Sequence, residues 1–217
     1  MSRAFFQRLL KKPGFVPAAL LFLLASGCGK NTGTSDTATV VQPARAVTPS
    51  SALAVIDLAG RTLDPFDAPA AKAIVFIFIS SDCPISNRYA PEIRRVAEEF
   101  HRAGAALWLV YADADTSPDA IETHLKEYQL PLKVLRDPQH ALVRLSQVHV
   151  TPEAAVFLPG RRLVYHGRID NRYAALGKER PEATQRDLRN VLEAVLQGKP
   201  APYSTAPAVG CYIPDPK

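Results

Sequence analysis

Long apolar runs are scarce in this sequence of 217 residues. The longest, FVPAALLFLLA at residues 15–25, falls short of the roughly 20 apolar residues that a membrane-spanning helix needs. No other stretch approaches that length, so the sequence predicts no helix that crosses a bilayer. The sequence also lacks internal repeats and any sign of a second folded domain.

An excess of one charge is missing from the body of the chain. Four of its 26 basic residues lie in residues 1–28, which contain no acid, and this leaves 22 basic against 21 acidic residues elsewhere. A nearly neutral body excludes a nucleic-acid-binding protein. With 47% hydrophobic residues, the chain has enough apolar surface for one globular core.

The first 28 residues have the order of an export signal. A basic segment precedes the apolar run, and small residues then lead to Cys28. The stretch LLASGC resembles the lipobox of bacterial lipoproteins, whose cysteine is lipidated, although Ala25 stands where leucine is commonest. The alternative is an ordinary secretory signal that is cleaved nearby. Residues 1–28 are therefore interpreted as a lipoprotein-like signal peptide that ends at the lipidation residue Cys28.

This resemblance implies a location in the bacterial cell envelope. The chain is expected to be lipid-anchored and to face the periplasm, with the membrane as a partner through the anchor. Gly29 follows the cysteine in place of aspartate, which by resemblance to Gram-negative sorting favours the outer membrane over the inner one. Residues 29–51 are rich in Thr, Ser, Ala and Pro and are expected to form a flexible tether.

The remaining residues alternate between strand-like and helix-like segments, which predicts an α/β domain over residues 52–200. Apolar runs predict strands at residues 52–57, 73–80, 106–113, 132–135, 153–159 and 162–168. Helical spacing or capping predicts helices from Cys83 to Gly104 and over residues 118–129, 139–147 and 188–196. Residues 201–217 form a C-terminal tail that carries Cys211.

This order of elements, with a cysteine at the start of the first long helix, resembles the thioredoxin fold. More narrowly, it is similar to the redoxins of the alkyl hydroperoxide reductase and thiol-specific antioxidant superfamily. Pro91 stands at the spacing from Cys83 at which thioredoxins carry a proline in the helix, and VTPEAAVF offers Pro152 as their cis-proline. The resemblance covers roughly residues 51–200 and implies a central mixed sheet flanked by helices.

Cys83 is the candidate nucleophile. A thiolate at a helix N-terminus is stabilised by unpaired backbone N–H groups and by the helix dipole, and Pro84 suits the first helical turn. Arg88 adds positive charge one turn on, whereas the carboxylate of Asp82 opposes ionisation unless it turns away. The alternative is a buried structural cysteine. The resemblance implies that Pro84, Thr151 and Pro152 form the substrate groove.

The usual second cysteine of the motif is absent, because Ser86 occupies its place in CPIS. Ser86 is then expected to donate its hydroxyl to the sulfur. If Cys28 is lipidated, Cys83 and Cys211 are the two remaining thiols, and Cys211 is the candidate resolving residue. The alternative is a Cys211 that is free or that pairs with another molecule.

Two other functions remain open. A thiol peroxidase of the peroxiredoxin type fits less well, because Phe76 and Ser80 stand where that group carries proline and threonine. The stretch TPEAAV also lacks the arginine that the group carries after its Thr-Pro site, and Arg168, farther along the chain, is the candidate to replace it. A copper-binding module would need Cys211 or His149 as a further ligand to the metal. A non-catalytic module with the thioredoxin fold is the other alternative. The other four histidines are expected at surface positions.

The sequence thus predicts an envelope thiol-disulfide oxidoreductase. Cys83, Ser86 and Cys211 are its candidate catalytic residues, and protein or small-molecule thiols and disulfides are its expected partners. Neither an organic cofactor nor a metal is implied.

Overall fold

The computed structural model describes residue 53 and residues 55–216. The predicted signal peptide at residues 1–28, with its lipidation residue Cys28, and the predicted tether at residues 29–51 lie outside the described residues. The helices are α1 (Pro84–Ala103), α2 (Pro118–Glu127), α3 (Ala141–Ser146) and α4 (Asp187–Leu196). The strands are β1 (Val55–Ile56), β2 (Thr62–Leu63), β3 (Ala73–Phe78), β4 (Ala105–Tyr111), β5 (Lys133–Arg136), β6 (Val150–Thr151), β7 (Glu153–Leu158), β8 (Arg162–Gly167), β9 (Tyr173–Ala175), β10 (Lys178–Glu179), β11 (Thr205–Ala206) and β12 (Cys211–Tyr212).

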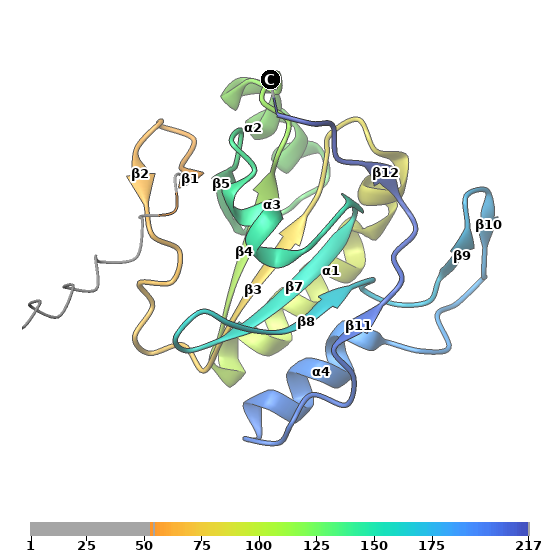
Figure 1. The fold of residues 1–217 in the computed structure, drawn as a ribbon. Coiled ribbons are helices and arrows are strands. Elements are labelled where there is room, and N and C mark those ends of the chain that lie inside the picture. The colour runs from red at the N-terminus through yellow and green to blue at the C-terminus, as the bar shows by residue number, and fades with distance from the viewer. Residues whose placement is uncertain (1–52, 54, 217) are drawn as a thin grey trace, which may run out of the picture. The chain divides into compact units, whose positions relative to one another are not determined.

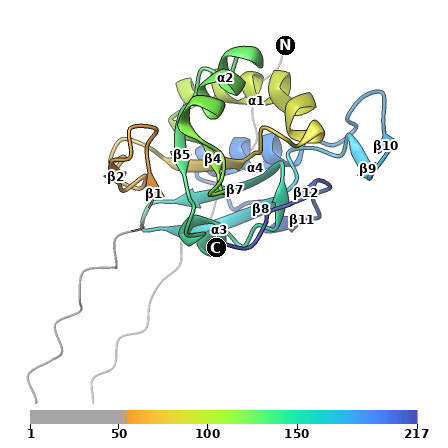
Figure 2. The ribbon, with the colours of Figure 1, turned by 90° about the horizontal axis from the view of Figure 1, so that it is seen from above.

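Eight of the described strands form one mixed sheet in the order β11-β8-β7-β3-β4-β5-β1-β2 (Figure 1). Strands β3, β4 and β5 run parallel, whereas β7 lies antiparallel to β3. Figure 2 shows α1 and α2 on one side of this sheet and α3 on the other. The predicted α/β class and thioredoxin-like fold, with a central mixed sheet between helices, are therefore confirmed.

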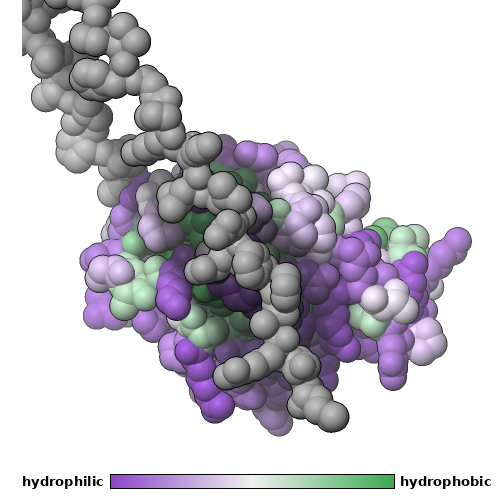
Figure 3. All heavy atoms as spheres, turned by 90° about the horizontal axis from the view of Figure 1, so that it is seen from below, coloured by the Kyte–Doolittle hydropathy of each residue, from purple (hydrophilic) through white to green (hydrophobic). Residues whose placement is uncertain are grey.

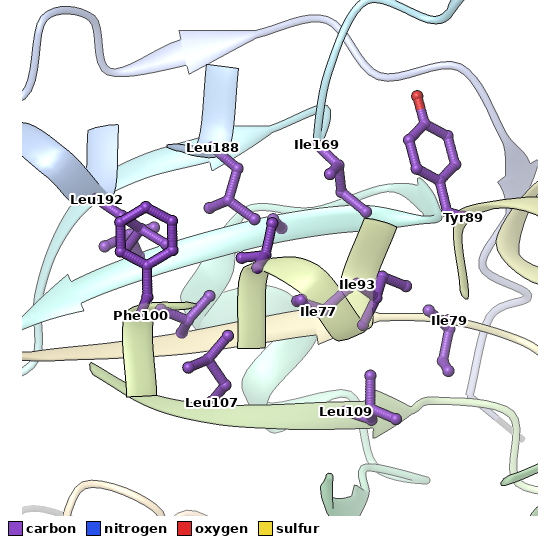
Figure 4. Packing of buried hydrophobic residues seen from close by; sticks show 14 of the residues in the cluster. Ile77, Ile79, Tyr89, Ile93, Phe100, Leu107, Leu109, Ile169, Leu188 and Leu192 are labelled. Carbon is purple, nitrogen blue, oxygen red and sulfur yellow. The ribbon is translucent and has the colours of Figure 1, made fainter. Parts of the chain in front are cut away.

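The central strand β3 contributes side chains to the apolar layers on both faces of the sheet. All six of its residues are buried, as expected for a strand that is covered on both faces. Val75 and Ile77 belong to the apolar cluster that also includes residues of α1 and α4, while Phe76 and Phe78 belong to the cluster on the α3 side. Figure 4 shows the first cluster, in which side chains of α1, α4 and the sheet interdigitate.

Helix α1 carries the candidate nucleophile at its start. Cys83 is the N-cap residue, Pro84 occupies the first helical position, and Gly104 ends the helix with φ 102°. Proline at the first position leaves no backbone N–H unpaired there, and glycine adopts the left-handed conformation without a Cβ clash. The helix continues through Pro91.

The C-terminal tail adds strands that the sequence did not predict. β11 lies parallel to β8, and β12 pairs antiparallel with β6. β9 and β10 form a further two-stranded sheet before α4.

The face seen in Figure 3 is mostly hydrophilic, with smaller apolar areas between the polar ones. None of the helices in the described part of the chain is long and apolar enough to cross a membrane.

Candidate active site

Cys83 lies in the loop between β3 and α1, and only 1% of its surface is exposed. Its Sγ accepts a hydrogen bond from the backbone N–H of Ser86 at 3.5 Å, so the sulfur caps the helix. A sulfur at this position faces the positive end of the helix dipole. The predicted helix-start position of Cys83 is thus present in the structure, although its side chain is more buried than polar neighbours suggest.

Ser86 lies in the first turn of α1 and is also buried. Its hydroxyl contributes to lowering the pKa of the Cys83 thiol, and the predicted role of Ser86 as a hydroxyl donor in the reaction stays a prediction. The same Oγ accepts from the backbone N–H of Ser80 at 3.4 Å. Ser86 therefore connects the sulfur to the loop that precedes it.

Thr151 and Pro152 pack against Cys83 from the far side. Their peptide bond is cis, as the resemblance implied, and the Cys83 Sγ donates to the Thr151 carbonyl oxygen at 3.0 Å. This contact favours the protonated thiol. The Thr151 hydroxyl is buried and has no hydrogen-bond partner among the described residues. It is therefore available to donate to the Cys83 sulfur once the thiol has lost its proton.

Cys211 reaches the site through β12. Cys211 pairs with Thr151, Tyr212 pairs with Val150, and the Ile213 N–H donates to the His149 carbonyl at 3.1 Å. Both cysteines are free thiols, and both line the same pocket. The structure therefore brings together the two thiols that the sequence separates by more than a hundred residues.

Gly210 is what allows this close approach. A Cβ on Gly210 would lie 2.1 Å from the Thr151 carbonyl oxygen and 3.2 Å from the Pro152 nitrogen. Real Cβ atoms do not approach an oxygen as closely as 2.1 Å, so only glycine lets the tail backbone cross the Thr151–Pro152 loop at this point. The position of Cys211 depends directly on this residue.

The two thiols ionise in a definite order. Burial raises the pKa of Cys83, but the hydrogen bonds from Cys211, Ser86 and Thr151 outweigh it and lower the pKa to about 7. Burial, together with the hydrogen bond to Cys83 and the charge there, raises the pKa of Cys211 to about 11. Near neutral pH a large fraction of Cys83 is therefore the thiolate, whereas Cys211 remains a thiol.

A pocket of about 230 Å³ opens beside the two sulfurs. It is lined by Ile79, Ser80, Asp82, Cys83, Ala112, Asp113, Thr151, Cys211, Tyr212, Ile213 and Pro214. A larger cavity of about 480 Å³ at the far end of α1, which includes Trp108, contains no cysteine. The smaller pocket is the candidate active site because the reactive groups line it.

Other residues singled out from the sequence lie apart from the sulfur. Pro84 is exposed at the start of α1 and does not line the pocket, in contrast to the expected groove position. Arg88 pairs with Glu179 at 2.6 Å, and Arg168 pairs with the buried Asp187 at 2.8 Å. Neither arginine lines the pocket, so neither supplies positive charge there. His149 is exposed, and its backbone is what contacts the tail.

The prediction that the remaining histidines lie at the surface is wrong for two of them. His140 and His124 are buried, and His124 joins Tyr111 Oη at 2.7 Å to Asn87 Oδ1 at 2.8 Å. Asn87 in turn donates to the Ser81 carbonyl at 3.0 Å, so this chain of hydrogen bonds holds the loop before Cys83. In the sequence, the only indication of these contacts was that His124 is a polar residue on the apolar face of α2.

Metal binding has no cluster of ligands to support it in the described residues, where no three His, Cys, Asp or Glu side chains are grouped to hold an ion.

Comparison with known proteins places these residues in a wider group. Residues 46–166, more than half of the chain, match the AhpC/TSA family. No curated protein sequence matches the chain.

Solved structures also resemble the chain. A hypothetical protein from Sinorhizobium meliloti 1021 is 24% identical over 73% of this chain and 88% of its own, with a TM-score of 0.63. An uncharacterized conserved protein from Geobacillus kaustophilus is 24% identical over 76% of this chain and 89% of its own, also with a TM-score of 0.63. Both similarities concern the fold alone.

Proposed function

Because the chain belongs to the AhpC/TSA family, we propose that it is a thiol-disulfide oxidoreductase in which Cys83 is the nucleophile and Cys211 the resolving thiol. Family membership indicates oxidoreductase activity on thiol substrates. The observation that carries the specific proposal is the pairing of β12 with β6, which sets Cys211 opposite Thr151, the residue whose carbonyl contacts the Cys83 sulfur, and places both cysteines in the lining of one pocket.

The reaction would proceed in two exchanges. The Cys83 thiolate attacks one sulfur of a substrate disulfide, and the other sulfur leaves as a thiolate that takes up a proton. Cys211 then loses its proton and attacks the Cys83 sulfur, which releases the second substrate thiol and forms a Cys83–Cys211 disulfide. Two electrons pass from the protein to the substrate, and the reverse sequence oxidises a dithiol.

The site favours this order of attack. Before the reaction, the negative charge on Cys83 contributes to the raised pKa of Cys211. Once Cys83 is held in a mixed disulfide, that charge is gone, so the pKa of Cys211 falls and its thiolate becomes easier to form. Cys211 therefore stays protonated until Cys83 has reacted.

A peroxidase function has less support from the geometry. Activation of a peroxide O–O bond benefits from a cation beside the thiolate. The side chains that line the pocket include no arginine, lysine or histidine, and Arg168 is held by Asp187 instead.

The experiment uses the full chain with Cys28→Ser, so that Cys83 and Cys211 are its only thiols. The reduced protein is mixed with a small disulfide, and mass spectrometry without reducing agent follows the products. We expect loss of two hydrogens and a Cys83–Cys211 cross-linked peptide. Adding Cys211→Ser should instead trap half of the disulfide on Cys83, and adding Cys83→Ser should abolish both products. Two free thiols that persist under oxidising conditions would contradict the proposal.

We also propose that the protein acts in the bacterial cell envelope, anchored at Cys28 and facing the periplasm, with the outer membrane as its site. The support is the lipobox-like sequence LLASGC followed by Gly29. An oxidising compartment is also where a pair of protein thiols is expected to cycle through a disulfide.

A further inference from the structure

The chain's own tail covers the backbone edge beside the nucleophile. An extended polypeptide binds a sheet edge by pairing with exposed N–H and C=O groups. Here β12 already pairs with β6, and Gly210 lies directly over the Thr151–Pro152 peptide. A polypeptide substrate would have to displace β12 before it could pair beside Cys83.

The route that remains is the pocket between the tail and the loops at residues 80–83 and 112–113. Its volume of about 230 Å³ is smaller than the roughly 300–1,000 Å³ typical of sites for drug-sized ligands. Tyr212 at its rim is 86% exposed, so the pocket is open to solvent. These dimensions suit a molecule with few atoms on each side of a disulfide bond.

The charges that face the pocket have one sign. Besides the Cys83 thiolate, Asp82 and Asp113 are the only charged side chains in its lining, and Asp82 is exposed at the mouth. Basic residues on neighbouring elements are already engaged, since Arg88 pairs with Glu179 and Arg136 donates to the Thr116 carbonyl at 3.2 Å. With the Cys83 thiolate, the pocket concentrates negative charge, which attracts cations and repels anions.

Building on the function proposed above, we propose that the substrates are small disulfides that carry positively charged groups close to the sulfur atoms, as in the disulfides of aminothiols. The Cys83 thiolate forms a bond to one sulfur of such a disulfide and the first aminothiol leaves. Cys211 then displaces the second aminothiol. One disulfide and the protein dithiol thus become two aminothiols and the Cys83–Cys211 disulfide.

The test compares two probes of similar size, the dication cystamine and the dianion dithiodipropionate. Rates of oxidation of the reduced full chain, carrying Cys28→Ser, are measured for each by stopped flow. Each rate is divided by that of mercaptoethanol with the same probe, which removes the intrinsic difference in reactivity between the two disulfides. The normalised ratio of cystamine to dithiodipropionate should be at least about tenfold.

Variants identify the source of this preference. Asp82→Asn and Asp113→Asn should each lower the ratio severalfold, and Asp82→Lys should bring it to about one or below. The matched control is Asp119→Asn, which removes an exposed carboxylate of α2 outside the pocket and should leave the ratio unchanged. A probe peptide with one cysteine disulfide-bonded to mercaptoethanol should react more slowly than cystamine after the same normalisation.

The outcomes separate the two proposals. If no disulfide oxidises Cys83, the proposed function fails and this inference fails with it. If Cys83 reacts but the normalised ratio is near one, if the Asp82 and Asp113 variants leave it unchanged, or if the peptide reacts faster than cystamine, the inference is wrong while the proposed function stands.

Discussion

The reactivity of Cys83 depends on a balance between burial and hydrogen bonding. Removal of a thiolate from water raises its pKa, and here the donors around the sulfur reverse that effect and bring the pKa to about 7. Ser86 supplies two of those donors, its backbone N–H and its hydroxyl. Ser86, which stands in place of a second cysteine in the motif, therefore lowers the pKa of Cys83.

Removal of the Ser86 hydroxyl tests this balance. Ser86→Ala loses a donor that favours the thiolate, so the pKa of Cys83 should rise from about 7 toward its ordinary value of 9.0. The midpoint of the pH profile for alkylation by iodoacetamide, measured in the Cys28→Ser chain, should move up, and the rate at neutral pH should fall. Ser146→Ala is the control, because Ser146 is equally buried but lies on α3. An unchanged midpoint in Ser86→Ala would show that the Ser86 hydroxyl does not lower the pKa of Cys83.

The position of Arg168 predicts a slow reaction of Cys83 with hydrogen peroxide. Since Arg168 is bound to Asp187 and lies outside the pocket, the Cys83 thiolate should react with hydrogen peroxide within about tenfold of the rate of an unassisted thiolate. Arg168→Lys should leave that rate unchanged. Competition kinetics against a free thiol measure both quantities, and fast peroxide consumption that depends on Arg168 would reverse the ranking of the two functions.

Among the elements, β12 decides which thiol meets Cys83. This strand has only two residues, and its placement relies on pairing with β6 and on the absence of a side chain at Gly210. Disulfide formation requires Cα atoms roughly 4.4–6.8 Å apart, so a small displacement of the tail is enough to prevent it.

A side chain at Gly210 should therefore uncouple the two thiols. In Gly210→Val, the added Cβ would meet the Thr151 carbonyl oxygen at 2.1 Å, so β12 has to move away from β6. Formation of the Cys83–Cys211 disulfide should slow by about tenfold or more, because proximity is lost, while the first attack by Cys83 continues. Quenched-flow alkylation with peptide mapping follows both steps.

The control for this variant is Pro207→Val, which adds no bulk at the crossing and changes an exposed tail residue. Its disulfide should form at the normal rate. Equal rates in Gly210→Val and the unaltered tail would show that Cys211 reaches Cys83 without the observed strand pairing.

At the scale of the whole molecule, the apolar layers on both faces of the sheet hold the site in place. Helix α4 packs Leu188 and Leu192, both fully buried, into the same cluster as Ile93 of α1 (Figure 4). Because α1 carries Cys83 and α4 precedes the tail that carries Cys211, the two thiols depend on one shared core.

Loss of side-chain volume in this core should destabilise the fold. Leu188→Ala is expected to lower the free energy of unfolding by about 2–5 kcal/mol, since it removes apolar contacts and leaves a cavity. Leu176→Ala, at a residue that is 68% exposed, should change it by no more than about 0.5 kcal/mol. Denaturant titration followed by circular dichroism gives both values, and equal effects would contradict the assigned core.

Membrane attachment is a prediction about the chain as a whole that rests on its sequence. Cys28→Ser should abolish lipidation, so the protein should no longer sediment with membranes after expression in a Gram-negative host. Fractionation with radiolabelled palmitate tests this directly. If the variant is processed normally and still sediments with membranes, the lipoprotein interpretation is wrong.

The fold class and the helix start at Cys83 could be predicted from the sequence, because the apolar run before Cys83 and the proline at position 84 are local patterns. The cis-proline at Pro152 was expected from the resemblance to redoxins, and the structure confirms it. Apolar periodicity likewise identified the main helices and the long strands, because burial of one or both faces leaves its pattern in neighbouring residues.

How residues far apart in the sequence meet could not be predicted from the sequence. The sequence offered Cys211 as a partner without its position, and strand pairing between β12 and β6 supplied that position. The same holds for Arg168, which binds Asp187 instead of the site, and for His124, whose buried contacts join α2 to the loop before Cys83. Such contacts depend on where whole elements pack and on the missing Cβ of Gly210, and no local periodicity in the chain encodes them.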